Sequence, residues 1–289
     1  MDLTTTDLKT LSETARNAAR IAGKYIQSQF DQHYITERKE GGDSLASQVV
    51  TEVDLNAQRI ILEQLYASMK AYDLGILTEE LPDDHSRFDK DYFWCIDPMD
   101  GTLPFTEHRT GYAVSIALIS RFGDPVIGVV YVPDSRDGYS AIKGSGVFLN
   151  GKPFVRNTLE KEIIHFYMDR SFQSESYFDL VKSHFEANYE VQYHADYGGV
   201  RNALGVVSST RGCYFKFPKP QKGCGSIWDY AATRLFFEEL DLPVTNAQGH
   251  QLHLNNSKTT FMNESGILYA TDTELQKFIL DIGTRVADQ

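Results

Sequence analysis

The sequence has few of the features that identify secreted or membrane-embedded proteins. Its 289 residues include only three cysteines, Cys95, Cys213 and Cys224, and no two of them form a Cys-x-x-Cys pair. A disulfide framework and a thiolate zinc site are therefore not indicated. No segment approaches the roughly 20 apolar residues that span a bilayer, and the N-terminus lacks the basic start and apolar core of a signal peptide. We expect a cytoplasmic protein with no membrane partner.

Basic residues are also scarce. The chain has 28 lysines and arginines against 40 aspartates and glutamates, which gives a formal net charge of -12. A surface that coats a nucleic acid needs a basic footprint, so a nucleic-acid polymer is not an expected partner. A small anionic substrate is not excluded, because metal ions or a few lysines can make one pocket locally positive. The composition, with 42% hydrophobic residues, is that of a folded globular protein.

Hydrophobic periodicity predicts the main helices. Apolar residues recur at spacings of three and four over residues 6–30, which indicates a helix with one buried stripe. A polar stretch at 39–47 interrupts the pattern, and a second helix is expected from near Thr51 to before Tyr72. Further helices are expected at 177–188, 230–240 and 273–282.

Short apolar runs predict the strands. The run 92–96 stops at Asp97-Pro98, as a strand does where proline removes a ladder donor, so an aspartate-rich segment is expected at a strand's end. Asn150-Gly151 is a strong hairpin signal. Other strand candidates are 113–119, 126–132, 163–168 and 267–270. We expect an α+β first half with an antiparallel sheet, and a soft boundary that divides the chain into 1–155 and 156–289.

Four separated acidic sites are candidates for chemistry. Hard divalent cations prefer oxygen ligands, and magnesium usually takes few carboxylates together with water and substrate phosphate. The four sites are Asp54, Glu79-Glu80, Asp97 with Asp100, and Asp229.

Each acidic site also has a purely structural interpretation. Thr51-x-x-Asp54 and Ser226-x-x-Asp229 match helix capping boxes. The segment 97–101 has the composition of a turn, and Glu79-Glu80 alone would be a solvated face. Only the joint occurrence of the four sites, in this order, favours a shared cation site.

Together these motifs resemble a known family. The segments 50–54, 77–80, 94–102 and 228–232 are similar to the four signature segments of the inositol monophosphatase superfamily. This superfamily includes inositol monophosphatases, 3'(2'),5'-bisphosphate nucleotidases and fructose bisphosphatases. The resemblance runs from the first helix to the final strand. It implies an α/β (α+β) fold, a layered αβαβα sandwich with the active site between the two halves.

The resemblance further implies the roles of the acidic residues. Two or three magnesium ions would polarise the phosphate and lower the pKa of a bound water, so that water attacks in line without a phosphoenzyme. The implied metal ligands are Glu79, Asp97, Asp100, Asp229 and the carbonyl of Met99. The implied catalytic residues are Asp54, Thr102 and Glu79, of which Asp54 and Thr102 would orient the water and take up its proton. The amides of Gly101 and Thr102 would bind the phosphate.

Two other interpretations compete with this one. Asp100-Gly101-Thr102 is similar to the motif of haloacid-dehalogenase-like phosphatases, but there the two aspartates are two positions apart, whereas Asp97 and Asp100 are three apart with a proline between them. A catalytically silent member that only binds a phosphate ligand would have lost a metal carboxylate or the Asp54 and Thr102 pair. All of these residues are present.

Basic residues near Asp229 indicate the kind of substrate. Inositol-specific members have an acidic residue seven positions before the Trp-Asp aspartate, and this chain has Lys222 there. A lysine cannot accept hydrogen bonds from sugar hydroxyls, but it can meet a second phosphate. The expected substrate-binding residues are Gly101, Thr102, Gly198, Gly199, Arg201 and Lys222, with Lys216 and Lys219 nearby.

These cations favour a 3'(2'),5'-bisphosphate nucleotidase that converts adenosine 3',5'-bisphosphate to AMP and phosphate. The alternative is an inositol-1-monophosphatase or another small sugar-phosphate phosphatase. The resemblance also implies lithium sensitivity, and it leaves both a monomer and a homodimer open.

Overall fold

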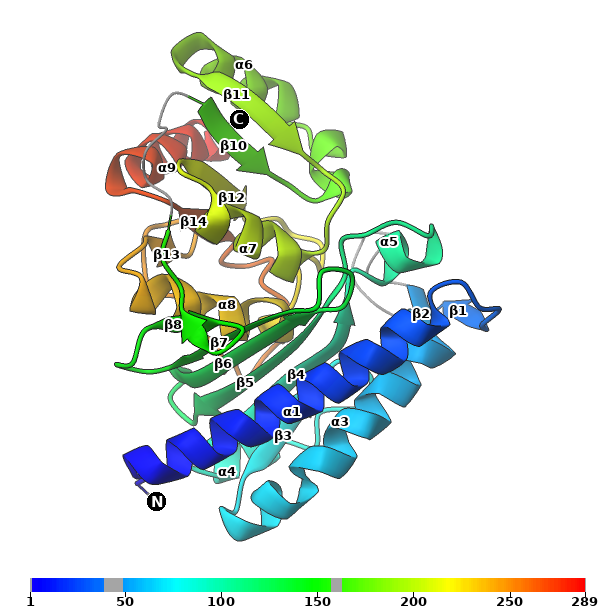
Figure 1. Ribbon diagram of the computed structural model, residues 1–289. Coiled ribbons are helices and arrows are strands. Elements are labelled where there is room, and N and C mark those ends of the chain that lie inside the picture. Colours follow the sequence, from blue (N-terminus) through cyan, green and yellow to red (C-terminus); the bar gives the residue numbers. More distant parts are fainter. Residues whose placement is uncertain (1, 39–48, 157–162, 289) are drawn as a thin grey trace.

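The computed structural model describes residues 2–38, 49–156 and 163–288, whose elements follow one another as labelled in Figure 1. The principal helices are α1 (Thr5–Gln29), α3 (Glu52–Ala71), α6 (Phe178–Asn188), α7 (Gly199–Ser208), α8 (Ile227–Glu239) and α9 (Thr273–Ala287). Shorter helical turns are α4 (Ser86–Asp89), α5 (Thr102–Thr106) and η1 (Arg170–Ser174). The predicted helices are confirmed, and the predicted break at 39–47 lies outside the described residues.

The strands form two large sheets and one small one. A seven-stranded sheet has the order β3 (Gly75–Thr78), β4 (Tyr92–Asp100), β5 (Ala113–Ser120), β6 (Pro125–Val132), β7 (Asp137–Ile142), β8 (Val147–Leu149) and β9 (Lys152–Pro153). A five-stranded sheet has the order β11 (Glu190–His194), β10 (Ile163–Tyr167), β12 (Gly212–Lys216), β14 (Ile267–Ala270) and β13 (Val244–Thr245). The short strands β1 (Thr36–Arg38) and β2 (Val49–Thr51) pair with each other.

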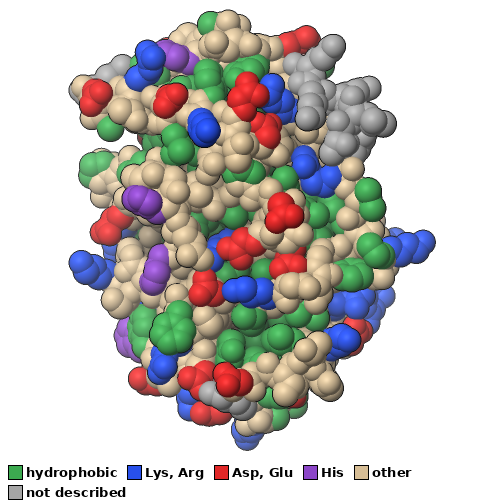
Figure 2. Space-filling view, turned by 90° about the vertical axis from the view of Figure 1, so that its left-hand side faces the viewer, with side chains coloured by type: hydrophobic (Ala, Val, Ile, Leu, Met, Phe, Trp, Pro, Cys, Tyr) green, Lys and Arg blue, Asp and Glu red, His purple; other side chains and the backbone are tan. Residues whose placement is uncertain are grey.

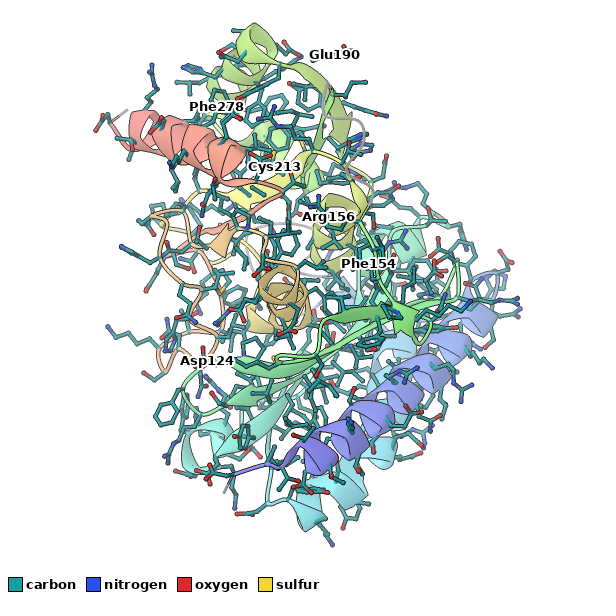
Figure 3. The ribbon with its side chains drawn as sticks, turned by 60° about the vertical axis from the view of Figure 1, so that its left-hand side comes forward. Asp124, Phe154, Arg156, Glu190, Cys213 and Phe278 are labelled. Carbon is teal, nitrogen blue, oxygen red and sulfur yellow. The ribbon has the colours of Figure 1, made fainter. Side chains whose placement is uncertain are left out.

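These elements stack in five layers, which confirms the predicted αβαβα sandwich (Figure 1). Helices α1 and α3 cover one face of the seven-stranded sheet, and α7 and α8 lie between the two large sheets. Helices α6 and α9 cover the outer face of the five-stranded sheet. Apolar side chains fill the spaces between layers as three buried clusters. Figure 3 shows this filling: Cys213 of β12 belongs to the cluster beneath α6 and α9, and the partly buried Phe278 of α9 packs against that cluster.

The antiparallel first sheet is largely as predicted. All its neighbouring strands are antiparallel except β3 and β4, which are parallel. The hairpin at Asn150-Gly151 is confirmed, since both residues have positive φ, 52° and 78°, as a type I′ turn requires.

One strand boundary was predicted wrongly. Strand β4 does not stop at Asp97-Pro98 but continues to Asp100, and its pairing with β5 shifts register between Asp97 and Asp100. A shift of this kind lets a strand accommodate a residue that cannot donate to the ladder. The acidic segment therefore forms the irregular end of a central strand.

The exterior agrees with the charge balance of the sequence. On the face shown in Figure 2, acidic and basic side chains are interspersed among the described residues. Among the helices in the described part of the chain, none has the length and apolar character needed to cross a membrane.

Candidate active site

The N-termini of three helices, α3, α7 and α8, lie beside the C-terminal end of β4. At each of these N-termini, backbone N–H groups donate hydrogen bonds to an aspartate. Asp54 lies in the first turn of α3 and accepts hydrogen bonds from the Thr51 amide (2.7 Å) and hydroxyl (2.6 Å). Asp229 lies in the first turn of α8 and accepts from the Ser226 amide at 2.9 Å. Both capping boxes predicted from the sequence are confirmed.

The third helix is bound by a residue distant in sequence. Asp100 accepts the amides of Gly199 and Val200 at the start of α7, each at 2.9 Å. Unpaired N–H groups and the helix dipole favour negative charge at a helix N-terminus. The folding of α3, α7 and α8 therefore brings carboxylates together at one place.

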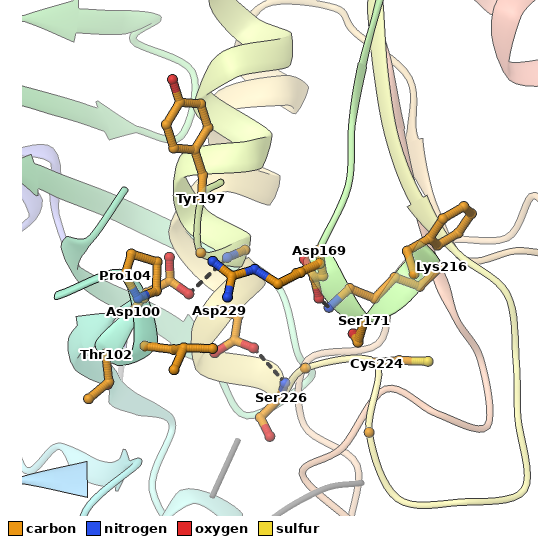
Figure 4. A pocket seen from close by; sticks show the side chains of 18 of the residues that line it. Asp100, Thr102, Pro104, Asp169, Ser171, Tyr197, Lys216, Cys224, Ser226 and Asp229 are labelled. Carbon is orange, nitrogen blue, oxygen red and sulfur yellow. Dashed lines mark hydrogen bonds and ion pairs between the residues drawn. The ribbon is translucent and has the colours of Figure 1, made fainter. Parts of the chain in front are cut away.

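Asp97, Asp100 and Asp229 form a close cluster, with carboxylate oxygens that lie within 4.8 Å of one another. Figure 4 shows Asp100 and Asp229 turned toward the same space beside Thr102. Asp97 and Asp100 are buried, and Asp229 is partly buried. Asp97 is held in place by the Met99 amide, which donates to it at 3.0 Å.

Burial, and after it the charge of neighbouring carboxylates, raises the pKa of each clustered carboxyl group. Burial comes first for all three, and neighbouring charges add to it: Glu79, Asp100 and Asp229 act on Asp97, and Asp229 acts on Asp100. The pKa of Asp229 rises to about 6. Like charges this close are unfavourable without a cation. Three oxygen ligands of this kind fit a hard divalent cation such as Mg²⁺.

Glu79 follows β3 and lies at the edge of the cluster. Its amide donates to the carbonyl of Ile96 at 3.2 Å, which fixes the segment beside β4. Its charge contributes to the raised pKa of Asp54, Asp97 and Asp229, and its side chain lines the cavity described below. The structure therefore brings Glu79 to the three aspartates.

Asp54 and Thr102 form a hydrogen-bonded pair next to the cluster. The Thr102 hydroxyl lies 2.9 Å from Asp54 Oδ1 and 3.1 Å from the carbonyl oxygen of Met99, and it can donate its single proton to either. Burial raises the pKa of Asp54 to about 6, and the charge of Glu79 adds to this, while hydrogen bonds from Thr51 and Thr102 oppose it. An acceptor with this pKa suits proton transfer near neutral pH.

Two glycines permit the close approach of the segments. Gly101 has φ 88°, and a Cβ there would lie 2.7 Å from the carbonyl oxygen of Gly111. A Cβ on Gly198 would lie 2.4 Å from Asp100 Oδ2. Only glycine fits these positions without displacing a neighbour.

The cluster opens into a cavity of about 570 Å³ between the ends of the two large sheets. The expected residues Gly101, Thr102, Gly198 and Gly199 line it, with all the expected carboxylate ligands and Met99. Arg201 and Lys222 are not among the lining residues. Arg201 binds Asp134 at 2.8 Å, and the exposed Lys222 lies over the ring of Phe261.

On the cavity wall opposite the cluster, sequence reasoning named Lys216 and Lys219 but missed their carboxylate partners. Asp169, two residues after β10, binds Lys216 (Figure 4). It also accepts a hydrogen bond from the Tyr214 hydroxyl at 2.8 Å. Burial is the largest single influence on the pKa of Lys216 and lowers it, but the charge and hydrogen bond of Asp169, together with Tyr230 and Cys224, raise the pKa above its usual value overall. Lys219 binds Glu175 at 2.7 Å. Neither carboxylate belongs to a motif, so only the proximity of two strands in the fold identifies them.

The fold and the site together define a class of protein. Its members are five-layered sandwiches in which carboxylates at the N-termini of helices line a cavity between the two large sheets. The sequence matches the inositol monophosphatase family over residues 7–282. The chain belongs to this family.

Curated relatives agree over part of their length. The chain is 34% identical over 162 residues to an inositol-1-monophosphatase of Synechocystis, which covers 55% of this chain and 53% of that protein. It is 34% identical over 137 residues to the Nus factor SuhB of Salmonella typhimurium, which covers 47% and 49%. The chain thus spans about half the length of the curated relatives it matches.

Solved structures share the fold over almost the whole chain. One is an IMPase/NADP phosphatase complexed with NADP and Ca²⁺, with TM-score 0.76, 21% identity and coverage of 98% of this chain and 97% of that one. A second is an IMPase/NADP phosphatase complexed with Mg²⁺ and phosphate (TM-score 0.72, 21% identity, 95% of each chain). A third is a lithium-soaked inhibitory complex of staphylococcal inositol monophosphatase-1 (TM-score 0.76, 20% identity, 98% and 96%).

Proposed function

We propose that the protein is a magnesium-dependent hydrolase of phosphate monoesters. The observation that carries this proposal is the cluster of Asp97, Asp100 and Asp229, whose oxygens lie within 4.8 Å of one another beside the Asp54–Thr102 pair. Membership of the inositol monophosphatase family supports the same chemistry. Magnesium bound there would polarise the phosphate and make a bound water more acidic.

The protein's own groups have distinct tasks in this proposal. Asp97, Asp100 and Asp229, with Glu79 and the Met99 carbonyl, hold the cations. The Thr102 hydroxyl accepts a hydrogen bond from the attacking water and donates one to Asp54. As the water attacks, its proton passes to Thr102, and the proton of Thr102 passes to Asp54. The amides of Gly101 and Thr102, at the start of α5, would donate to the phosphate, whereas those of Gly199 and Val200 are bound to Asp100. No covalent phosphoenzyme is needed, because water is the nucleophile.

We propose adenosine 3',5'-bisphosphate as the preferred substrate. A cavity of about 570 Å³ is within the range that holds nucleotide-sized ligands. Among the described residues, four basic side chains line it outside the carboxylate cluster: Arg109, Arg170, Lys216 and Lys219. An ester with a second phosphate can use such cations, whereas inositol 1-phosphate carries only the phosphate that the metal site would bind. The names of the relatives make inositol 1-phosphate the second candidate.

The test is phosphate release from adenosine 3',5'-bisphosphate, inositol 1-phosphate and fructose 1,6-bisphosphate, with magnesium and with a chelator. We expect magnesium-dependent release, greatest for the nucleotide. Absence of metal-dependent release from every ester would refute the enzyme and leave a phosphate-binding protein. The lithium complex of the staphylococcal relative supports a further expectation, that lithium inhibits the reaction.

A further inference from the structure

Two arginines on the cavity wall share one carboxylate. Arg170, at the start of η1, places Nη1 and Nη2 at 2.9 and 2.8 Å from the two oxygens of Glu107. Arg109 donates from Nε to Glu107 Oε2 at 2.9 Å and from Nη1 to Asp196 at 2.9 Å. Both arginines and Asp196 line the cavity, whereas Glu107 is not among the lining residues. Both arginines therefore face the cavity, while the carboxylate that they share does not line it.

Their exposure separates these arginines from the lysines of the same cavity. The side chains of Arg109 and Arg170 are 31% and 49% exposed, whereas those of Lys216 and Lys219 are 11% and 14% exposed. Removing the partner from a buried ion pair is strongly destabilising, while an exposed pair contributes little. The arginines can therefore turn toward a ligand at small cost, and the lysines cannot.

The chemistry of the guanidinium group specifies the ligand. Its planar set of donors binds phosphate oxygens in pairs, and a phosphate monoester carries more charge and more acceptor oxygens than a carboxylate. Two guanidinium groups that share one carboxylate can hold a phosphate between them while Glu107 keeps them aligned.

We propose that Arg109 and Arg170 form the subsite for the second phosphate of a bisphosphorylated substrate. This proposal rests on the proposed function and assigns the distal phosphate to the arginines in place of Lys222. The subsite uses segments from both sides of the cavity, since Arg109 follows α5 and Arg170 follows β10. The Glu107 carboxylate positions the guanidinium groups and does not contact the substrate.

The experiment compares two esters that differ only in that phosphate. Kinetics are measured with magnesium on adenosine 3',5'-bisphosphate and on adenosine 3'-monophosphate, for the wild type, Arg109→Ala and Arg170→Ala. Arg121→Ala is the matched control, because Arg121 is exposed on the β5–β6 turn and lies outside the cavity. We expect each arginine variant to raise KM for the bisphosphate at least tenfold and to leave kcat/KM for the monophosphate within twofold. Arg121→Ala should change neither.

The outcomes distinguish this proposal from the proposed function. Equal losses on both esters would show that the arginines act only on the structure, and unchanged kinetics would show that they do not meet the substrate; either result overturns the subsite. If the wild type hydrolyses neither nucleotide, the proposed substrate fails and the subsite fails with it; the proposed hydrolase itself fails only if inositol 1-phosphate and fructose 1,6-bisphosphate are not hydrolysed either. Arg170→Lys keeps the charge but loses the paired donors, so an intermediate KM for the bisphosphate is expected even if Arg170→Ala does not fold.

Discussion

The carboxylate cluster and the arginine–lysine wall of the same cavity hold their charges in different ways. Asp97, Asp100 and Asp229 are like charges, packed within 4.8 Å and supported only partly by backbone N–H groups. On the wall, Lys216 and Arg170 each bind a carboxylate of opposite sign. The cluster stores unfavourable repulsion that a divalent cation would relieve, whereas each cation of the wall already has a carboxylate partner, and only its more exposed arginines can meet a further anion. Chemistry is expected at the first region and substrate choice at the second.

The largest expected effect comes from removing a charge in the cluster. Asp97→Asn and Asp229→Asn weaken the metal site, and losing several kcal/mol of charge stabilisation corresponds to about a thousandfold in rate. Activity assays with calorimetric titration of magnesium test this. Both variants should lose activity and magnesium affinity together. Unchanged magnesium affinity would contradict the ligand assignment.

A smaller loss is expected from the residues that handle the proton. Thr102→Val keeps the shape of the side chain but removes the hydroxyl that lies 2.9 Å from Asp54. We expect kcat to fall about a hundredfold for this variant and for Asp54→Asn, within the usual range of acid–base catalysis. Magnesium affinity should stay within about threefold, because neither side chain is an expected ligand. A parallel loss of magnesium affinity would place both residues in the metal site instead.

The stability of the metal-free protein tests what it costs to hold the carboxylates of Asp54 and Asp229 charged, a cost that comes first from burial and then from the charge of Glu79. The pKa of Asp54 and of Asp229 rises from 3.8 to about 6, so each folded carboxyl group stays protonated while its unfolded counterpart ionises. The resulting loss of stability begins as pH rises through about 4 and is complete above about 6 for these two groups. Each rise corresponds to about 3 kcal/mol. Asp97 and Asp100, whose pKa values are also raised, extend the effect to higher pH.

Magnesium should cancel this destabilisation. We expect it to raise the melting temperature by at least about 4 °C more at pH 7.5 than at pH 5, relative to a chelator. Thermal unfolding of the wild type and Asp97→Asn, with magnesium and with EDTA at both pH values, measures the effect. The variant should show a smaller difference. An equal rise in melting temperature with magnesium at both pH values would show that ionising the clustered carboxyl groups does not destabilise the metal-free protein.

The two regions also differ in how far the sequence predicts them. Asp54 and Asp229 each cap the helix in which they lie, so short motifs in the sequence identify them. The structural role as a helix cap and the proposed role at the metal site belong to the same side chains. Helix α7 was not predicted, because it begins with Gly199 and no capping side chain, and Asp100 supplies the cap from 99 positions away. The same long range separates Glu107 from Arg170, which are 63 positions apart. Single-sequence patterns do not carry such contacts.

The smallest expected effect concerns Lys222, which the sequence placed at the second phosphate. Its side chain is exposed and lies 5.9 Å from the centre of the Phe261 ring, outside the cavity lining. Phe261 itself lines the cavity. Lys222→Glu can therefore affect substrate binding by shifting the Phe261 ring and by a charge that solvent and salt screen. We expect kcat/KM for adenosine 3',5'-bisphosphate to fall by less than about threefold, and the difference to vanish as salt is raised. The opposite outcome is a loss of tenfold or more in the kcat/KM of Lys222→Glu that persists at high salt, together with unchanged kinetics of Arg170→Ala. It would show that Lys222, and not the arginines, binds the second phosphate.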